Sequence, residues 1–392
     1  MPQNLPEDPT IRSLVQAARR AQMSRRAMIL GTAGTIGAAS AVSLTACAPS
    51  RDSITWDNWS LYIDEDDAGD YPTLLGFEDE SGLRVNYRVE VDDNNTYYAK
   101  VKDQLALGQD IGADVVCLTD WMVARLIRQE YVQKFDKAAM PNATGNLTPS
   151  LLQPDWDPGR THSLPWQGGF AGICWNKEKL PNGLKNIEDL WDPSLKGRVG
   201  VLSEMRDTIG LIMLSQGIDI SGDFSAADFA KANDVFREQV ESGQIRNIKG
   251  NSYIEDLTNE DTLAAIVWSG DVTTLNAEAG DKWEFMIPET GGTLWNDNFV
   301  APIGSKKLED VQKLIDYYYD PAVAAEVAAW VNYITPVVGA KEEAEKIDPE
   351  LAENQLIFPN EETLAQVKVF RGLTAEEEED FGGQFQNVLL GV

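Results

Sequence analysis

The feature that most limits the fold of this chain is a regular alternation of strand-like and helix-like hydrophobic patterns. Strand-length apolar runs are separated by stretches whose apolar residues recur at helical spacing, and Gly82 and Gly108 end the first two of these helices. Strands that alternate with helices along a chain are typical of an α/β sheet, which we therefore expect. In the first series we expect strands at residues 53–58, 83–89 and 114–117 and helices at residues 71–81, 95–107 and 121–131.

A second α/β series follows a polar, proline-containing stretch at residues 141–158. Asp320 and Pro321 form a typical helix start, with a capping side chain followed by a proline in the first turn. The acidic run at residues 376–380 is interpreted as a solvated helix start. In this series we expect strands at residues 169–176, 198–202, 264–268, 283–287 and 295–302 and helices at residues 226–242, 308–319 and 322–331.

The length of the chain, 392 residues, exceeds what one hydrophobic core normally serves, so we expect two lobes. The expected first lobe comprises residues 53–168 and 299–340, and the expected second lobe comprises residues 169–298 and 341–392. More than one strand would then cross between the lobes and act as a hinge.

The charge balance excludes several classes of function. The chain has 33 Lys and Arg against 63 Asp and Glu, a net charge of −30, which disfavours binding to nucleic acid or to anionic lipid. A single histidine, His162, excludes a multi-histidine metal site. No nucleophile elbow, phosphate-binding loop or metal-ligand cluster is present, so we expect no catalytic residues, no metal and no cofactor. An exported glycosidase that uses Glu204 and Asp207 stays as a minor alternative.

The first 46 residues have the pattern of an export signal. Arginines precede an uncharged run at residues 27–46, and the run ends in small residues before Cys47. Residues 24–29 resemble the twin-arginine export motif, and residues 44–47 resemble the bacterial lipobox, in which the cysteine is lipidated. A permanent transmembrane helix is the alternative, but glycine, serine and threonine dilute the hydrophobicity of the run. We expect a twin-arginine lipoprotein signal peptide at residues 1–46, lipidation of Cys47 and a tether at residues 47–52.

The two other cysteines, Cys117 and Cys174, lie in apolar, strand-like runs. Export would permit a disulfide between them. Two separate buried thiols are nevertheless the preferred interpretation, because cysteine in such a run behaves as a small hydrophobic residue.

Four short segments combine an aromatic residue with polar or acidic residues at the end of a strand-like run. An aromatic ring and a carboxylate are what an organic ammonium ion requires, because the ring attracts the cation and the carboxylate accepts its hydrogen bonds. Open α/β sheets place their ligands at strand ends. The segments cover residues 58–62, 118–121, 267–271 and 294–297.

These segments and others resemble the bacterial spermidine/putrescine-binding proteins, the receptors of polyamine ABC transporters. The resemblance extends in order over nearly the whole chain after residue 47. The matching motifs are Asn-Trp-x-x-Tyr at residues 58–62, Asn-x-x-Tyr-Ala-Lys at 95–100, Asp-Val-Val-x-x-Thr-x-Trp at 114–121, Glu-x-Arg-Asp at 204–207, Ile-x-Trp at 266–268, Gly-Gly-x-x-Trp-x-Asp at 291–297 and Tyr-x-Thr-Pro at 333–336.

The resemblance implies a type II periplasmic-binding-protein fold with a ligand cleft between the lobes. Asp297 would hold an ammonium group, and Trp268 and Trp295 would stack on the ligand chain. Leu61 departs from the family pattern, which often has Glu there, and Asp120 is a possible additional carboxylate, so the choice between putrescine and spermidine stays open. The implied ligand-binding residues are Trp59, Tyr62, Thr119, Trp121, Glu204, Asp207, Trp268, Trp295, Asp297 and Tyr333.

The expected function is that of an exported, monomeric receptor that is held on the outer side of the cell membrane by its lipid. It would capture a polyamine and deliver it to the permease subunits of an ABC transporter. The alternative keeps the receptor but changes the ligand to another small solute, such as a quaternary amine, an amino acid derivative or a sugar, because these also bind to aromatic side chains.

Overall fold

The computed structural model describes residues 53–391, without the side chains of residues 277–279. The expected signal peptide at residues 1–46, the tether at residues 47–52 and the lipidation site Cys47 lie outside the described residues. Within residues 53–391, no helix has both the length and the apolar character that crossing a membrane requires. The expected α/β architecture is confirmed, since helices and strands alternate and the strands form one ten-stranded sheet.

The first half of the molecule surrounds one of two hydrophobic cores. Its elements are β1 (Ser53–Trp59), α2 (Pro72–Ser81), β2 (Arg84–Val91), α3 (Asn94–Ala106), β3 (Val115–Thr119), α4 (Asp120–Arg128), α5 (Pro141–Asn146), α10 (Leu308–Tyr318), α11 (Pro321–Val331), α12 (Ala340–Ile347) and α13 (Pro349–Ala352). Strand β1 lies between β2 and β3 and is parallel to both. Trp56 of β1, Met122 of α4 and Leu314 of α10 are buried together in the first core.

The second half surrounds the other core. Its elements are β5 (Val199–Leu202), α6 (Met205–Ser215), α7 (Ala226–Glu241), β6 (Ile245–Lys249), α8 (Tyr253–Thr258), β7 (Ala264–Trp268), α9 (Ser269–Ala279), β8 (Trp283–Met286) and α15 (Ala375–Leu390). Strand β5 is parallel to both β6 and β7. Phe229 of α7 stacks on Phe381 of α15 with ring centroids 4.2 Å apart, which fixes the C-terminal helix to this half.

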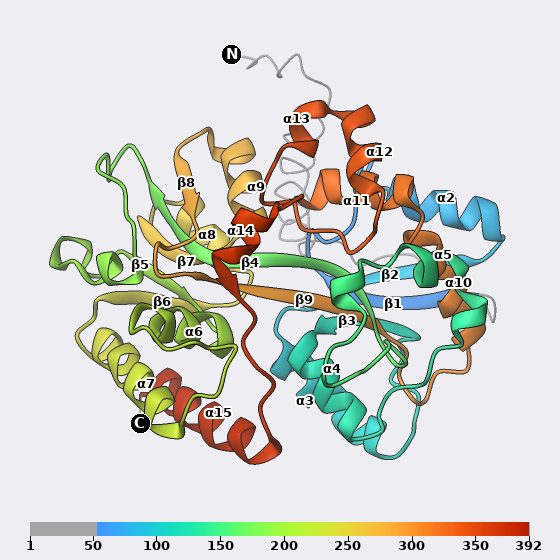
Figure 1. The fold of residues 1–392 in the computed structure, drawn as a ribbon, viewed down its shortest axis with the longest axis horizontal. Coiled ribbons are helices and arrows are strands. Elements are labelled where there is room, and N and C mark those ends of the chain that lie inside the picture. The colour runs from blue at the N-terminus through green and yellow to red at the C-terminus, as the bar shows by residue number, and fades with distance from the viewer. Residues whose placement is uncertain (1–52, 392) are drawn as a thin grey trace, which may run out of the picture.

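Two long strands, β4 (Leu164–Asn176) and β9 (Gly292–Val300), cross between the halves (Figure 1). They are antiparallel, and their pairing runs from Leu164 opposite Phe299 to Ala171 opposite Thr293. Leu164 is buried in the first core, whereas Ile173 of the same strand is buried in the second. The sheet order is β2-β1-β3-β9-β4-β7-β5-β6, so these two strands stand at its centre.

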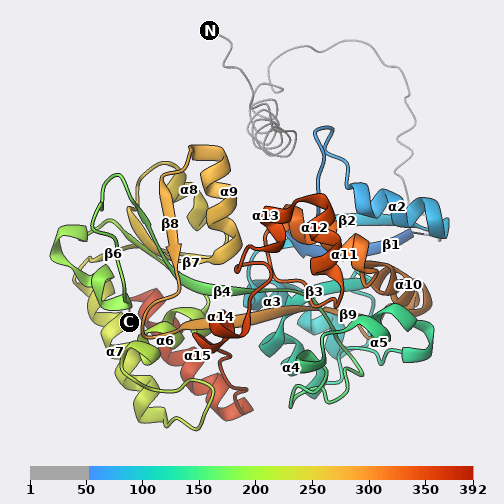
Figure 2. The same cartoon turned by 45° about the horizontal axis from the view of Figure 1, so that its top comes forward.

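The C-terminal segment passes from the first half to the second. After α13 the chain forms α14 (Glu361–Ala365) and β10 (Val367–Lys368), which pairs with β9 before α15 begins (Figure 2). Ala344 of α12 is buried in the first core. This differs from the expected division, which put residues 341–392 in the second lobe, and the reason is that α12 packs against α11.

Two local predictions are confirmed. Helix α11 begins at Pro321, and the Asp320 carboxylate accepts hydrogen bonds from the backbone amides of Ala322 and Val323. Cys117 lies in the first core and Cys174 in the second, and both are free, buried thiols.

Candidate functional site

A cavity of about 970 Å³ lies between the two halves of the molecule. Trp268 in its wall packs against both hydrophobic cores, which places the cavity at their junction. The volume is near the upper end of the range for small-molecule sites. The structure brings all the predicted binding residues together around it, namely Trp59, Tyr62, Thr119, Trp121, Glu204, Asp207, Trp268, Trp295, Asp297 and Tyr333.

Three of these residues stand where strands end. Trp59 is the last residue of β1, Thr119 of β3 and Trp268 of β7. Strands β3 and β7 each continue directly into a helix, so their last side chains stay at the sheet edge where α/β proteins bind ligands. The strand-end positions that the sequence indicated are confirmed for these residues.

Trp295 and Asp297 instead lie inside the crossing strand β9. They are two residues apart, so their side chains project from the same face of the strand. Asp297 stands opposite Thr119 of β3, and Trp295 stands opposite Gly169 of β4. A Cβ at Gly169 would lie 2.6 Å from the Trp295 ring, so only glycine leaves room for the indole. The strand that joins the two halves therefore also carries part of the cavity wall.

Aromatic side chains form a continuous row of edge-to-face contacts. The ring of Tyr62 lies 5.7 Å from that of Tyr333, which lies 5.3 Å from Trp295. Trp295 lies 6.4 Å from Trp268, which lies 5.8 Å from Tyr253. Such pairs stabilise one another in fixed orientations. The row spans both halves and gives the cavity a rigid apolar wall.

Asp297 is a buried carboxylate with an unused acceptor. It is 4 % exposed, and neither its Oδ1 atom nor the Tyr62 hydroxyl has a hydrogen-bond partner among the described residues. Burial raises the pKa of Asp297 to about 7, although the nearby hydroxyl groups of Thr119 and Tyr62 oppose this shift. A buried acceptor without a donor is costly, so this atom is suited to receive one from a ligand.

Asp207 has a different environment, because both of its oxygens are engaged. Trp268 Nε1 donates to Oδ2 at 2.9 Å, and Thr293 Oγ1 donates to Oδ1 at 2.5 Å. Burial raises the pKa of Asp207, while the hydrogen bonds from Thr293 and Trp268 oppose the shift. The carboxylate thus holds the Trp268 indole in place and adds negative charge to the cavity.

Asp271 is a cavity residue that the selection from the sequence did not include. The Tyr333 hydroxyl donates to its Oδ1 atom at 2.9 Å, and the Tyr253 hydroxyl donates to its Oδ2 atom at 2.6 Å. Burial raises the pKa of Asp271 to about 6, against the effect of the two hydroxyl groups. A signal for Asp271 existed, since it follows Trp268 in one of the four aromatic and acidic segments.

Glu204 and Arg206 bring opposite charges to the wall at the start of α6. Glu204 caps this helix, accepting a hydrogen bond from the Arg206 backbone amide at 3.2 Å. Burial raises the pKa of Glu204 to about 7, and the charge of Arg206 opposes the shift. Burial lowers the pKa of Arg206 to about 10, so its guanidinium keeps its charge at neutral pH.

The arrangement suits a small organic cation. Buried carboxylates accept charge-assisted hydrogen bonds, and the aromatic row covers methylene groups and attracts a cation through its ring faces. Two cores joined by crossing strands, with a ligand-sized cavity at the junction, define a two-lobe solute-binding protein.

The chain belongs to the family of bacterial extracellular solute-binding proteins, whose family model matches residues 76–357. One relative is the spermidine/putrescine-binding periplasmic protein of Salmonella typhimurium, which is 27% identical over 325 residues, 82% of this chain and 87% of the relative. Another is the putrescine-binding periplasmic protein PotF of Escherichia coli, which is 27% identical over 355 residues, 84% of this chain and 90% of the relative.

Solved structures confirm the fold. A putative spermidine/putrescine ABC transporter from Listeria monocytogenes superposes with a TM-score of 0.74 at 24% identity, covering 87% of this chain and 100% of that one. The PotD substrate-binding protein of Streptococcus pneumoniae gives a TM-score of 0.70 at 21% identity, covering 86% and 99%. The protein therefore has the two-lobe, type II periplasmic-binding-protein fold that the sequence motifs implied.

Proposed function

We propose that this protein is a receptor that captures a polyamine, putrescine or spermidine, between its lobes and delivers it to the permease of an ABC transporter. Relatives along most of the chain are named for binding putrescine, or spermidine and putrescine. These relatives are transport proteins, which supports a binding function rather than catalysis. The observation that carries the proposal is the buried Oδ1 atom of Asp297, which has no hydrogen-bond partner within residues 53–391 and lies beside the aromatic row.

An alkylammonium group matches this atom, because it carries a full charge and three N–H donors. Bound there, it would compensate the cost of burying the carboxylate. The methylene chain would lie on Trp295 and Trp268, where each buried methylene contributes about 0.8 kcal/mol. A second ammonium group would find negative charge at Asp207, Asp271 or Glu204, which line the same cavity. Two charged ends and an apolar middle are the chemistry of a polyamine.

Binding between two lobes implies hinge closure. We propose that the lobes close over the ligand by bending of β4 and β9, since these strands cross from one core to the other. The proposed lobes follow the expected division at residues 53–168 with 299–340 and at 169–298, with α15 in the second lobe.

The proposal includes export and anchoring. The twin-arginine pattern at residues 24–29 and the lipobox that ends at Cys47 support a secreted lipoprotein, tethered to the membrane outside the cytoplasm. The relatives are named as periplasmic proteins, which agrees with export. We propose that the protein acts as a monomer that docks on the permease subunits.

Calorimetry of the chain from residue 48 onward, titrated with putrescine and spermidine, tests the function. We expect micromolar or tighter binding of at least one polyamine, and a loss of at least tenfold in affinity for Asp297→Asn. Asp310→Asn is the matched control, because Asp310 is a carboxylate outside the cavity that pairs with Lys313. Binding of choline, an amino acid derivative or a sugar in place of either polyamine would overturn the proposed ligand.

A further inference from the structure

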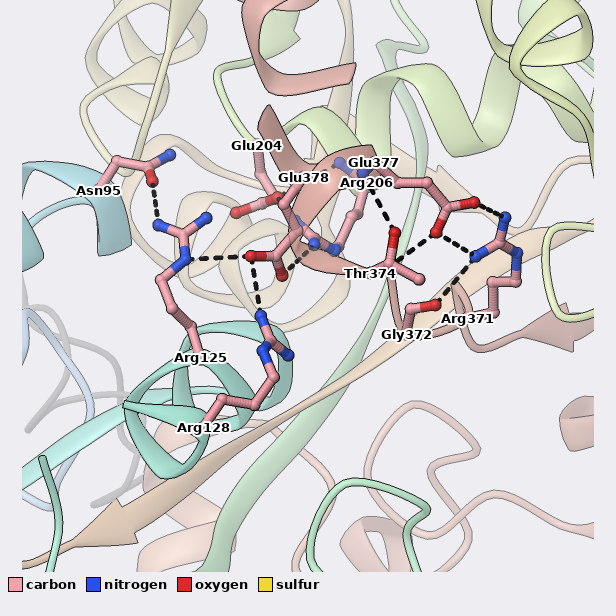
Figure 3. A network of polar contacts seen from close by, with 10 residues as sticks. All are labelled: Asn95, Arg125, Arg128, Glu204, Arg206, Arg371, Gly372, Thr374, Glu377 and Glu378. Carbon is pink, nitrogen blue, oxygen red and sulfur yellow. Dashed lines mark hydrogen bonds and ion pairs between the residues drawn. The ribbon is translucent and has the colours of Figure 1, made fainter. Parts of the chain in front are cut away.

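One carboxylate, Glu378 of α15, pairs with arginines from both halves of the molecule (Figure 3). Its Oε2 atom accepts from Arg125 Nε at 3.1 Å and from Arg128 Nη2 at 3.0 Å. Its Oε1 atom lies 3.5 Å from Arg206 Nη2. The Glu378 side chain is 8 % exposed, so water screens these pairs only partly.

These partners come from different halves of the molecule. Arg125 and Arg128 lie on α4, whose residues Met122 and Leu126 are buried in the first core. Glu378 lies on α15, which is fixed to the second core through Phe381. The two ion pairs with α4 therefore span the junction between the halves, at the rim of the cavity that Arg128 and Glu378 both line.

Trp121 joins the same cluster. The guanidinium carbon of Arg206 lies 4.3 Å from the centre of its ring, and that of Arg125 lies 5.1 Å from it. Trp121 belongs to α4 and Arg206 to α6, so this cation–π contact also connects the two halves. Because two guanidinium groups already occupy the surroundings of this ring, it is a poor place for a further cation.

Glu378 offsets part of the positive charge of the three arginines in this cluster. Without its carboxylate, the three arginines would face one another across the junction, and the acids Glu204 and Asp207 lie close to Arg206. Like charges that converge repel, and moving the halves apart would relieve the repulsion. Glu378 thus favours the state in which the halves are together.

We propose that Glu378 is a positioning residue that latches the closed state, tying α4 of the first lobe to Arg206 at the start of α6 and so slowing ligand release. The inference rests on the proposed function for the identity of the ligand. The latch, by which we mean the ion pairs of Glu378 with Arg125, Arg128 and Arg206, acts on the closure of the lobes whatever the ligand is. Arg206 lies two residues after Glu204 and directly before Asp207, so its ion pair with Glu378 stands next to two acids that line the cavity.

The test compares Glu378→Gln with Glu377→Gln. Glu377 is the neighbouring acid on the same helix, but it pairs with Arg371 at 2.6 Å, and Phe370 beside Arg371 belongs to the second core, so this ion pair does not cross the junction. Stopped-flow measurement should show that Glu378→Gln raises the dissociation rate of putrescine by about 10- to 100-fold, because removing one partner of a partly buried charge pair acts mainly on dissociation. Glu377→Gln should leave the rate within about twofold of the wild type.

Small-angle X-ray scattering without ligand gives an independent readout. The radius of gyration of Glu378→Gln should exceed that of the wild type at low salt. High salt should increase the radius of gyration of the wild type toward that of the variant, because salt screens the ion pairs. Arg128→Gln should also increase the radius of gyration, but by less. Because the Arg128 side chain is 42% exposed, this variant carries no risk of misfolding.

The outcomes separate the two proposals. If the wild type binds no polyamine but Glu378→Gln still expands, the latch holds and the proposed ligand fails. The proposed latch is wrong if the wild type binds putrescine and both Glu378→Gln and Arg128→Gln have the same putrescine dissociation rate and the same radius of gyration as the wild type. Equal effects of Glu377→Gln and Glu378→Gln would also overturn it, because the effect would then reflect the stability of α15 alone.

Discussion

The indole nitrogen of Trp268 donates a 2.9 Å hydrogen bond to Oδ2 of Asp207, which ties an aromatic wall of the cavity to a carboxylate on α6. Thr293 occupies the other oxygen of Asp207, whereas Oδ1 of Asp297 has no partner among the described residues. The two buried acids therefore differ in role. Asp207 orients the wall, and Asp297 is the acceptor that remains for a ligand.

Trp268→Phe should weaken putrescine binding by about 5- to 20-fold, because it keeps an aromatic ring but removes the donor that holds Asp207, a loss of about 1–2 kcal/mol. Calorimetry measures the change. The matched control is Trp330→Phe, since the Trp330 indole donates to the Glu65 carbonyl outside the cavity. In a double-mutant cycle with Asp207→Asn, the two losses should not add, and strict additivity would contradict the coupling.

Polyamine affinity should fall as the pH falls from 8 to 5.5. Burial raises the pKa of Asp297 and of Glu204 to about 7, so both acids gain protons over this interval in the unliganded protein. A protonated acid carries no charge for an ammonium group, and binding must first release the proton. Each acid that binds the ammonium group lowers the affinity by up to about tenfold for every pH unit by which the pH lies below its pKa.

Calorimetry near pH 6.5 in buffers of different ionisation enthalpy measures the proton release directly. We expect release in the wild type and less release in Asp297→Asn. Affinity that is constant between pH 8 and 5.5 would show that neither acid meets the ligand.

The unliganded protein should become more stable when Asp297 is replaced by Asn. Because the pKa of Asp297 is about 7 when folded and near 3.8 when unfolded, the folded state holds a proton that the unfolded state releases between these values. Stability from this group is therefore lost as the pH rises through that window. At pH 8, Asp297→Asn should raise the free energy of unfolding by about 1–3 kcal/mol.

Thermal unfolding at pH 8 and at pH 4 checks this prediction. At pH 4 the difference should nearly vanish, since the folded wild type is then protonated at this site. An equal effect at both pH values would indicate a change in packing instead of charge.

Gly270→Ala should displace Tyr333 and weaken binding by at least about tenfold. A Cβ at Gly270 would lie 2.8 Å from the Tyr333 ring and 2.9 Å from the Asn332 carbonyl oxygen. Moving the ring would break its hydrogen bond with Asp271, and overpacking of this kind costs about 1–3 kcal/mol. The control is Gly383→Ala in α15, where an added Cβ meets nothing within 4 Å and alanine should stabilise the helix. Wild-type affinity in Gly270→Ala would contradict the close packing around Tyr333.

Sequence patterns predicted helices with one buried face, such as α4 and α10, because burial on one side leaves a periodic signal. Helices α9 and α12 and strand β6 were not predicted. Helix α6 gave no such signal, since every residue from Asp207 to Leu214 is buried. The crossing strand β4 begins at Leu164, five residues before the predicted start. The prediction missed its first residues because Pro165 and Gly168 are typical of loops.

The candidate site was more accessible to prediction than the latch was. Aromatic and acidic residues at strand ends form a local pattern, and this pattern together with the resemblance to the spermidine/putrescine-binding proteins allowed Trp59, Thr119 and Trp268 to be selected. Glu378 lies in an acidic run that is typical of a solvated helix start, and the helix is indeed there. That this one acid meets Arg125, 253 positions earlier, depends on how the two halves pack, which no short pattern records.

Strand β9 crosses between the two halves of the molecule and also carries Trp295 and Asp297, which form part of the cavity wall. Under the proposed hinge closure, ligand binding and bending of β9 cannot be changed separately at these positions, because a substitution of Trp295 or Asp297 alters both the cavity wall and the strand that bends. Adjustment of ligand preference alone has more freedom at cavity residues that the crossing strands do not carry, such as Tyr62 and Glu204.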